Sequence, residues 1–293
     1  MSEYVVISDV GADIPAEVVE KIGIGMMPMD FEVDGKNYKH YYDSREMSGD
    51  EFYDRIKNGS MPKTSQITPF EYEEFLKPYL DAGKDILLLV FSSGLSSTYQ
   101  SSVMAVEELK EDYPDRKIYT VDSICASVGQ SLLIYLAMQK KNEGLSIEEL
   151  RDWIISNRLK VAHWFMVDDL NHLKRGGRVS SVSAVFGTAL NIKPMITLDE
   201  NGKLDVVDKV RGTKKGLSYI VDKITKEGKD SQEQTVIIGY TDRRELAEEL
   251  EKTLLEKGLI KDAIIAQLGP IIGAHVGTGF VALVYMTEEN LRK

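Results

Sequence analysis

The chain has 293 residues, of which 43% are hydrophobic, and its 36 basic and 47 acidic side chains leave a net charge of −11. A field of that sign repels phosphate backbones and anionic lipid headgroups, so we expect no nucleic-acid partner. No apolar run approaches the roughly 18 residues that a membrane-spanning helix needs, so we expect no stable membrane insertion.

The chain is long enough to bury two cores, so we expect two domains. Its start, MSEYVVISD, lacks the basic and apolar regions of a signal peptide. Cys125 is the only cysteine, which excludes an internal disulfide and fits a reducing compartment. These features favour a cytoplasmic protein.

The first half alternates short apolar runs with helical patterns. We expect strands at 4–7, 85–91 and 117–121, and helices at 15–22, 97–109 and 126–141. Apolar strands that are each followed by an amphipathic helix are typical of a parallel sheet covered on both faces. The pattern predicts a Rossmann-like domain, in which ligands gather beyond the carboxyl ends of the strands.

After an expected helix at 146–160, the pattern changes. Asn201-Gly202 predicts a hairpin turn with positive φ angles between strands at 192–198 and 204–210. Further strands are expected at 235–240, 263–268 and 280–286, with helices at 213–226 and 244–257. We therefore predict an α/β fold with a parallel-sheet domain at 1–158 and an α/β domain at 159–293, whose sheet is mixed or antiparallel.

The stretch SSGLSSTY, residues 92–99, follows the apolar run 85–91. A serine at a strand-to-helix turn resembles a nucleophile elbow, but the required G-x-S-x-G spacing is absent, and no phosphate-binding glycine motif replaces it. Ser96 or Ser97 can cap the next helix. Ser92 and Ser93 precede Gly94 and are predicted to face a cleft, where hydroxyls near a helix N-terminus suit a carboxylate or phosphate.

Two further loops carry candidate site residues. In the loop at 62–69, Thr68 before Pro69 is an ordinary helix start, whereas Thr64 and Ser65 have no evident structural duty.

The loop at 269–279 contains four glycines and His275, which predicts close backbone approach or positive φ around a functional histidine, with a structural histidine as the alternative. His40, His163 and His172 have no comparable setting. The histidine spacing predicts no metal site.

Basic clusters at 174–178 and 209–215 are local exceptions in an acidic chain. Such charges either solvate the surface or serve a phosphorylated ligand or an acidic partner.

Taken together, these motifs resemble the DegV family of bacterial fatty-acid-binding proteins. The resemblance runs nearly end to end and includes Ser8-Asp9 with Ala12-Asp13 near the start, TSQ, SSGLSSTYQS, VDS, LKRGGR, NIKP, KVRGTKK and GPIIGAHVGTG. It implies a Rossmann-like domain followed by an α/β domain, with one long-chain fatty acid held between them and into the second. No cofactor and no catalytic residue are implied.

The resemblance also implies the residues of the site. Thr64, Ser93 and His275 are expected to hold the fatty-acid carboxylate. Their expected neighbours in the same loops are Ser65, Ser92, Gly94, Gly273 and Ala274.

Some members of the family present the bound acid to a separate ATP-dependent kinase that forms acyl phosphate for phospholipid synthesis. In that role Arg178 and Arg211 would serve phosphoryl transfer or partner contact. Val10-Gly11 stands where the family commonly has Ser-Thr, which puts in doubt a role of that loop in the headgroup site. The apolar stretch 182–190 is a candidate lining of the tunnel. An acyl-ester hydrolase that uses Ser93 and His275 remains the alternative function.

Overall fold

The computed structural model describes residues 3–179 and 191–292, and its strands form three sheets. The first sheet is parallel throughout, in the order β2-β1-β6-β7, and comprises β1 (Tyr4–Asp9), β2 (Gly25–Met27), β6 (Asp85–Val90) and β7 (Ile118–Asp122). β6, DILLLV, is buried along its whole length, as its uninterrupted apolar run predicts for a strand covered on both faces.

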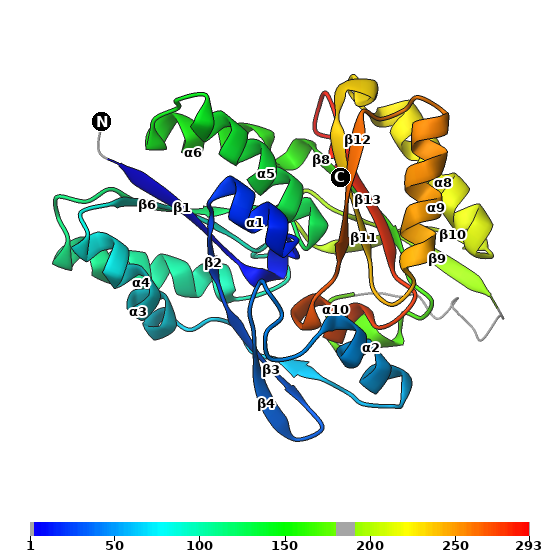
Figure 1. Cartoon of the computed structure of the whole chain (residues 1–293), viewed down its shortest axis with the longest axis horizontal. Helices are drawn as coiled ribbons and strands as arrows, with labels where there is room; N and C mark the ends of the chain where they lie inside the picture. The colour runs from blue at the N-terminus through cyan, green and yellow to red at the C-terminus, as the bar shows by residue number, and fades with distance from the viewer. Residues whose placement is uncertain (1–2, 180–190, 293) are drawn as a thin grey trace.

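A helix follows β1, β6 and β7, as expected for a Rossmann-like arrangement, while one further helix precedes β6 and another follows α5 (Figure 1). They are α1 (Ala16–Ile22), α3 (Pro69–Asp81), α4 (Thr98–Asp112), α5 (Val128–Asn142) and α6 (Ile147–Asn157). Thr68 and Glu71 form a capping box at the start of α3, which confirms the predicted helix start. α6 is shorter than predicted, because the chain tightens into a 3-10 turn at Arg158–Lys160.

A small antiparallel sheet, absent from the predictions, lies at the base of the molecule beside α2 (Gly49–Lys57) (Figure 1). It contains β3 (Met29–Val33), β4 (Lys36–His40) and β5 (Lys63–Thr64). Asp34 and Gly35 both have positive φ at the β3–β4 turn. Asp-Gly between alternating apolar residues is a strong hairpin signal, so this element could have been found from the sequence.

The third sheet has six strands in the order β10-β9-β8-β13-β11-β12. Its strands are β8 (Val161–Met166), β9 (Ile192–Leu198), β10 (Leu204–Arg211), β11 (Thr235–Tyr240), β12 (Asp262–Gln267) and β13 (Val281–Met286). Only the β11–β12 pair is parallel, so the sheet is mixed, as one of the two predicted arrangements required. The predictions missed β8.

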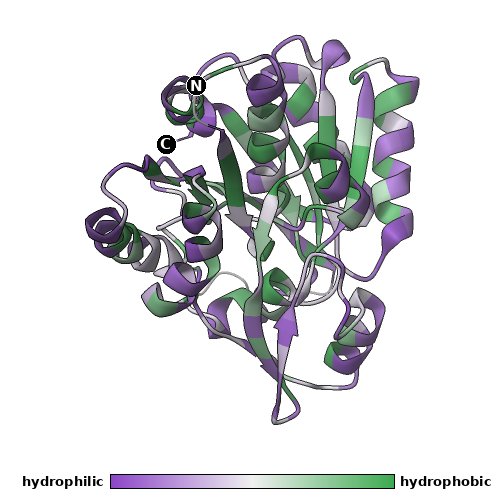
Figure 2. Ribbon diagram, turned by 60° about the vertical axis from the view of Figure 1, so that its left-hand side comes forward, coloured by the Kyte–Doolittle hydropathy of each residue, from purple (hydrophilic) through white to green (hydrophobic). Residues whose placement is uncertain are grey.

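The two faces of the six-stranded sheet are covered by different parts of the chain. α8 (Thr213–Glu227) and α9 (Arg244–Glu256) pack on the outer face, while α5 packs on the inner face (Figure 1). Figure 2 shows apolar strands inside the molecule and hydrophilic residues along the outward sides of the helices at its surface. Within the described ranges, no helix is both long and apolar enough to cross a bilayer.

Two details of the C-terminal half correct the predictions. The β9–β10 hairpin has a five-residue loop in which only Gly202 has positive φ, because the Asp199 carboxylate accepts hydrogen bonds from the amides of Asn201 and Lys203 and shapes the turn. The glycine-rich stretch after β12 is not a loop throughout: it contains the helix α10 (Pro270–Val276). The division of the chain at 158/159 stays a prediction.

Candidate functional site: a cavity between the two halves

A cavity of about 500 Å³ lies between the loops that end the parallel strands and the inner face of the six-stranded sheet. Thr64, Ser93 and His275, predicted from three separate stretches of sequence, all line it. The cavity lies beyond the carboxyl end of β6, where ligands of doubly wound sheets bind. Tertiary structure thus brings the predicted polar residues together, and we call these three residues the polar cluster.

Thr64 and His275 are in direct contact. The Thr64 hydroxyl lies 2.9 Å from His275 Nε2, within hydrogen-bonding distance. Thr64 is held by β5, where it pairs with Phe31 of β3, and His275 lies in the last turn of α10. Both side chains are half-buried, so a ligand that enters the cavity can reach them.

The second nitrogen of His275 faces Gly176. A Cβ atom on Gly176 would lie 2.6 Å from His275 Nδ1, so only glycine admits the imidazole at this position. Burial, and next the positive charge of Arg178, lower the pKa of His275 to about 4. The imidazole is therefore neutral at physiological pH, with one donor and one acceptor nitrogen.

Ser93 occupies the loop between β6 and α4. Its amide donates to Asp122 Oδ1 at 3.1 Å, and the same oxygen accepts from the amide of Ile124 at 2.9 Å. The carboxylate at the end of β7 thereby holds the loop, while the exposed Ser93 side chain makes no hydrogen bond within the described residues. This hydroxyl is available to a ligand.

The neighbouring serines have structural contacts. Ser92 is fully buried and donates to the Gly202 carbonyl at 2.9 Å, so it does not face the cavity as predicted. Gly94 lines the cavity and lies so close to the β9–β10 hairpin that a Cβ would approach the Asn201 carbonyl to 2.4 Å. Ser96 accepts from the amide of Thr98, the first residue of α4, at 3.2 Å, so one of the two predicted serines satisfies an amide at the helix start, whereas the N-cap residue Ser97 forms no side-chain capping hydrogen bond.

Of the remaining residues predicted to adjoin the polar cluster, one lines the cavity and two do not. Ser65 lines the cavity, whereas Gly273 and Ala274 are not among its lining residues. Gly273 lies inside α10, where a Cβ would clash with the Tyr53 hydroxyl at 2.6 Å. The predicted close backbone approach is present at this glycine, and positive φ is present at Gly277 and Gly279.

The two predicted arginines lie in different places. Arg178 lines the cavity, where its guanidinium donates to the carbonyls of Leu95, at 3.3 Å, and Gly176. Arg211 is exposed at the end of β10 and does not line the cavity.

Sequence reasoning set aside two residues that the structure places in the cavity wall: His163 and Gly11. His163 lies on β8 opposite Val284, and its Nδ1 is 2.9 Å from the Val161 carbonyl. The apolar segment VAHWFM would have identified this strand. Gly11 keeps the Val10-Gly11 loop in the site through its backbone, although the loop supplies no hydroxyl pair.

Among the residues described, no group of three or more histidine, cysteine or acidic side chains is placed to hold a metal ion. The predicted tunnel lining at 182–190 lies outside the described residues.

Comparison with known proteins assigns the family. The protein-family model described as "Uncharacterised protein, DegV family" matches residues 3–288 of the sequence. The chain belongs to the DegV family. A DegV domain-containing protein of Clostridium perfringens is 40% identical over 288 residues, which cover 98% of this chain and 99% of that protein.

Solved structures of this family share the fold. A DegV lipid-binding protein of Thermotoga maritima is 30% identical, with a TM-score of 0.85 over 98% of this chain and 99% of that one. A second T. maritima protein, described by its fatty-acid-binding function, is 29% identical, with a TM-score of 0.84 over 98% and 100% of the two chains. Both cover the parallel-sheet and mixed-sheet halves, so the predicted fold class and family are confirmed.

Proposed function

We propose that this protein binds one long-chain fatty acid, with its carboxylate at the polar cluster and its tail along the apolar remainder of the cavity. The observation that carries the proposal is the composition of the cavity: Thr64 contacts the neutral imidazole of His275, the Ser93 hydroxyl lines the same cavity, and most other lining residues are aliphatic or aromatic. Its volume falls within the range of roughly 300–1,000 Å³ that is usual for small-molecule sites. Related DegV structures are described as lipid-binding or fatty-acid-binding proteins.

The polar cluster supplies what a buried carboxylate needs. A lone carboxylate in an apolar site would take up a proton unless hydrogen-bond donors replace its lost water. With Nε2 protonated, His275 donates to Thr64 Oγ1, which leaves the hydroxyl hydrogen of Thr64 free for the ligand. Ser93, in the loop between β6 and α4, supplies a second hydroxyl from the same cavity wall.

The inner face of the six-stranded sheet offers the surface for the tail. Phe165 and Ala282 are paired across β8 and β13, and Leu198 and Leu204 are paired across β9 and β10, and all four line the cavity. At about 0.8 kcal/mol per buried methylene, a chain of roughly 16 carbons contributes on the order of 10 kcal/mol before ordering costs. Such a ligand would remain bound through purification.

Mass spectrometry of lipid extracted from the denatured, purified protein tests this proposal. We expect about one long-chain acid per chain, and uptake of added acid by delipidated protein. Finding no acid, together with no uptake of palmitate or oleate, would overturn it.

The hydrolase alternative has weaker support in the geometry. Ser93 makes no hydrogen bond to His275, whose Nε2 contacts Thr64 instead, and His275 Nδ1 faces Gly176 rather than an orienting carboxylate. Turnover of a p-nitrophenyl acyl ester would decide between the two functions. Turnover that is abolished in Ser93→Ala would favour the hydrolase.

We further propose that the protein presents its ligand to a separate ATP-dependent kinase in the cytoplasm and has no cofactor of its own. Arg178, beside the polar cluster, is placed to meet a phosphoryl group that arrives at the carboxylate, and the exposed Arg211 is placed for contact with the partner. The Arg178 guanidinium already donates to two backbone carbonyls. We therefore expect the polar cluster, and not Arg178, to hold the fatty-acid carboxylate.

Arg178→Ala is expected to retain its bound lipid and to lower acyl-phosphate formation with a cognate kinase. Lipid content and acyl phosphate are measured on the same preparation. An equal loss of lipid in this variant would assign Arg178 to the binding site instead.

A further inference from the structure

The peptide group that joins Leu268 to Gly269, directly before α10, is held on both sides by the N-terminal half. Tyr53 Oη of α2 donates to the Leu268 carbonyl at 2.7 Å. Asp13, at the end of the 3-10 turn Val10–Ala12, accepts from the Gly269 amide at 2.8 Å. The carbonyl and the amide of this peptide group are thus both hydrogen-bonded to residues that lie more than 200 positions earlier in the chain.

These contacts are buried and closely packed. Tyr53 is 1% exposed and Asp13 is 6% exposed. A Cβ on Gly269 would lie 2.2 Å from His40 Nε2, and one on Gly273 would lie 2.6 Å from the Tyr53 hydroxyl. The start of α10 therefore has little room to shift against the N-terminal half.

Asp13 also connects this peptide to a third element. Its second oxygen lies 2.6 Å from the Ser127 hydroxyl, at the residue before α5. Ser127 itself lines the ligand cavity and has a positive φ of 51°. One carboxyl group thus joins the N-terminal turn, the start of α5 and the start of α10.

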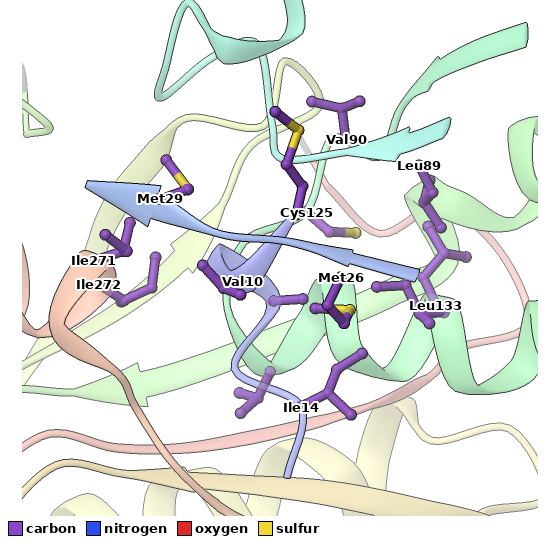
Figure 3. Close-up of a cluster of buried hydrophobic side chains, with 14 of the residues drawn as sticks. Val10, Ile14, Met26, Met29, Leu89, Val90, Cys125, Leu133, Ile271 and Ile272 are labelled. Carbon is purple, nitrogen blue, oxygen red and sulfur yellow. The ribbon is translucent and has the colours of Figure 1, made fainter. Parts of the chain in front are cut away.

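α10 depends on such contacts for its orientation. It has seven residues, and a helix of this length has little stability of its own. Ile271 and Ile272 of α10 lie beside Val10 and Met29 in the shared core (Figure 3). His275 follows six residues after Gly269, about 9 Å along the helix axis, so the direction set at Gly269 determines where the imidazole meets Thr64.

We propose that Asp13 and Tyr53 form a clamp on the Leu268–Gly269 peptide that positions α10, and thereby the His275 imidazole, for the ligand. Neither residue is part of the polar cluster, and both act through α10. The effect on ligand affinity rests on the proposed fatty-acid function, whereas the effect on α10 and on His275 does not.

The protonation state of Asp13 allows a conservative replacement. Burial, and secondarily the charge of Asp9, raise the pKa of Asp13 to about 8, so the acid form predominates at neutral pH. The Ser127 hydroxyl donates to Oδ2 and the Gly269 amide donates to Oδ1. Asparagine keeps an acceptor oxygen for Gly269, and its amide nitrogen can donate to the Ser127 oxygen, because a hydroxyl accepts as well as donates. Asp13, Leu268 and Gly269 also line a second cavity, separate from the ligand cavity. The other titratable and charged groups that line this second cavity are Glu17, His40, Tyr42, Asp43, Tyr240 and Arg244, and Tyr53 lies beyond the clamped peptide.

The test compares Tyr53→Phe, Asp13→Ala and Asp13→Asn with the matched control Tyr72→Phe. Tyr72 is an equally buried tyrosine whose hydroxyl has no hydrogen-bond partner in the described part of the chain. Two measurements on delipidated protein need no ligand: amide hydrogen exchange of residues 270–276, and NMR titration of the His275 imidazole.

We expect Tyr53→Phe and Asp13→Ala to speed exchange in α10 by about ten-fold or more, because a buried carbonyl or amide loses its partner. In both variants the pKa of His275 should rise from about 4 toward 6.5 as the imidazole gains solvent. Asp13→Asn should keep slow exchange. In wild type, folded Asp13 keeps a proton that the unfolded chain releases, so the contribution of Asp13 to stability falls as pH rises from 4 to 8. Asparagine does not titrate, so the free energy of unfolding of Asp13→Asn should not show this fall.

Unchanged α10 exchange and an unchanged His275 titration in a folded Tyr53→Phe variant would overturn the clamp, as would an equal loosening in Tyr72→Phe. If Asp13→Ala fails to fold, Tyr53→Phe and Asp13→Asn still decide the matter. Palmitate affinity is measured separately and is expected to fall about ten-fold in Tyr53→Phe. Absence of binding in wild type would reject the proposed function and leave the two ligand-free measurements as the test of the clamp.

Discussion

The two faces of the six-stranded sheet are built from the same strands and have opposite roles. Trp164 and Leu283 point to the outer face, where they pack against α8 and α9 in a closed apolar core. Phe165 and Ala282, one residue along the same strands, line the cavity on the inner face. Since side chains alternate between the faces of a strand, neighbouring positions separate stability from ligand binding.

The outer face should show the largest effect. Leu283 is fully buried there, so Leu283→Ala should lower the free energy of unfolding by about 3 kcal/mol through lost packing and a residual cavity. Denaturant unfolding measures the change. The folded variant should retain the proposed fatty-acid binding, and a parallel loss of binding would mean that the two faces are not independent.

Filling the inner face should give nearly as large an effect, on binding instead of stability. Ala282→Phe places a ring in the space proposed for the tail, and the loss of three or four buried methylenes should weaken fatty-acid affinity by about 100-fold. The free energy of unfolding should change by only about 1 kcal/mol, because the ring enters existing space. Isothermal titration with delipidated protein provides the affinity, and unaltered binding would place the tail elsewhere.

At the polar cluster, two nearby serines should behave differently. Ser93→Ala removes a proposed donor to the carboxylate and should weaken affinity roughly ten-fold with little loss of stability. Ser96 also lines the cavity, but its oxygen already accepts from the Thr98 amide at the start of α4, so Ser96→Ala should cost about 1 kcal/mol of stability and change affinity less than Ser93→Ala. Ligand titration and thermal unfolding of both variants test the pair, and the reverse pattern would contradict the assignment of Ser93.

The smallest effect concerns pH. The folded-state pKa of His275 is about 4, below its ordinary value of 6.5, so its contribution to stability is complete above pH 6.5 and is lost as pH falls toward 4. Compared with His275→Gln, wild type should lose about 1 kcal/mol between pH 6.5 and 5.5. Leu283→Ala should keep the wild-type dependence, because its outer core contains no histidine. Identical pH curves for wild type and His275→Gln would show that the imidazole is not buried as described.

Much of the fold followed from local patterns. The continuous apolar run of β6 and the Thr68-Pro69 signal before α3 identified those elements to within a residue. The β3–β4 hairpin and β8 were missed although Asp34-Gly35 and VAHWFM carried usable signals. α10 was mistaken for a loop because its glycines mark places where other parts of the chain approach it closely, at His40 and Tyr53.

The site shows the same limit. Hydroxyls at a strand end and a histidine among glycines were visible in the sequence, and the family resemblance named three of them as ligand-binding residues. Ser92 and Ser93 look equivalent in sequence, yet Ser92 donates to Gly202 and Ser93 faces the cavity. This difference arises from the β9–β10 hairpin, which lies more than 100 residues further along the chain.

By itself, the sequence determined the two kinds of sheet, most helix boundaries and three polar stretches whose residues line the cavity, because backbone geometry and burial impose local periods and caps. Only the tertiary structure decided which hydroxyl faces the cavity, that His163 and Arg178 line the cavity, and that Asp13 and Tyr53 hold the peptide before α10. Those arrangements depend on contacts between residues far apart in the chain, and no local pattern records such contacts.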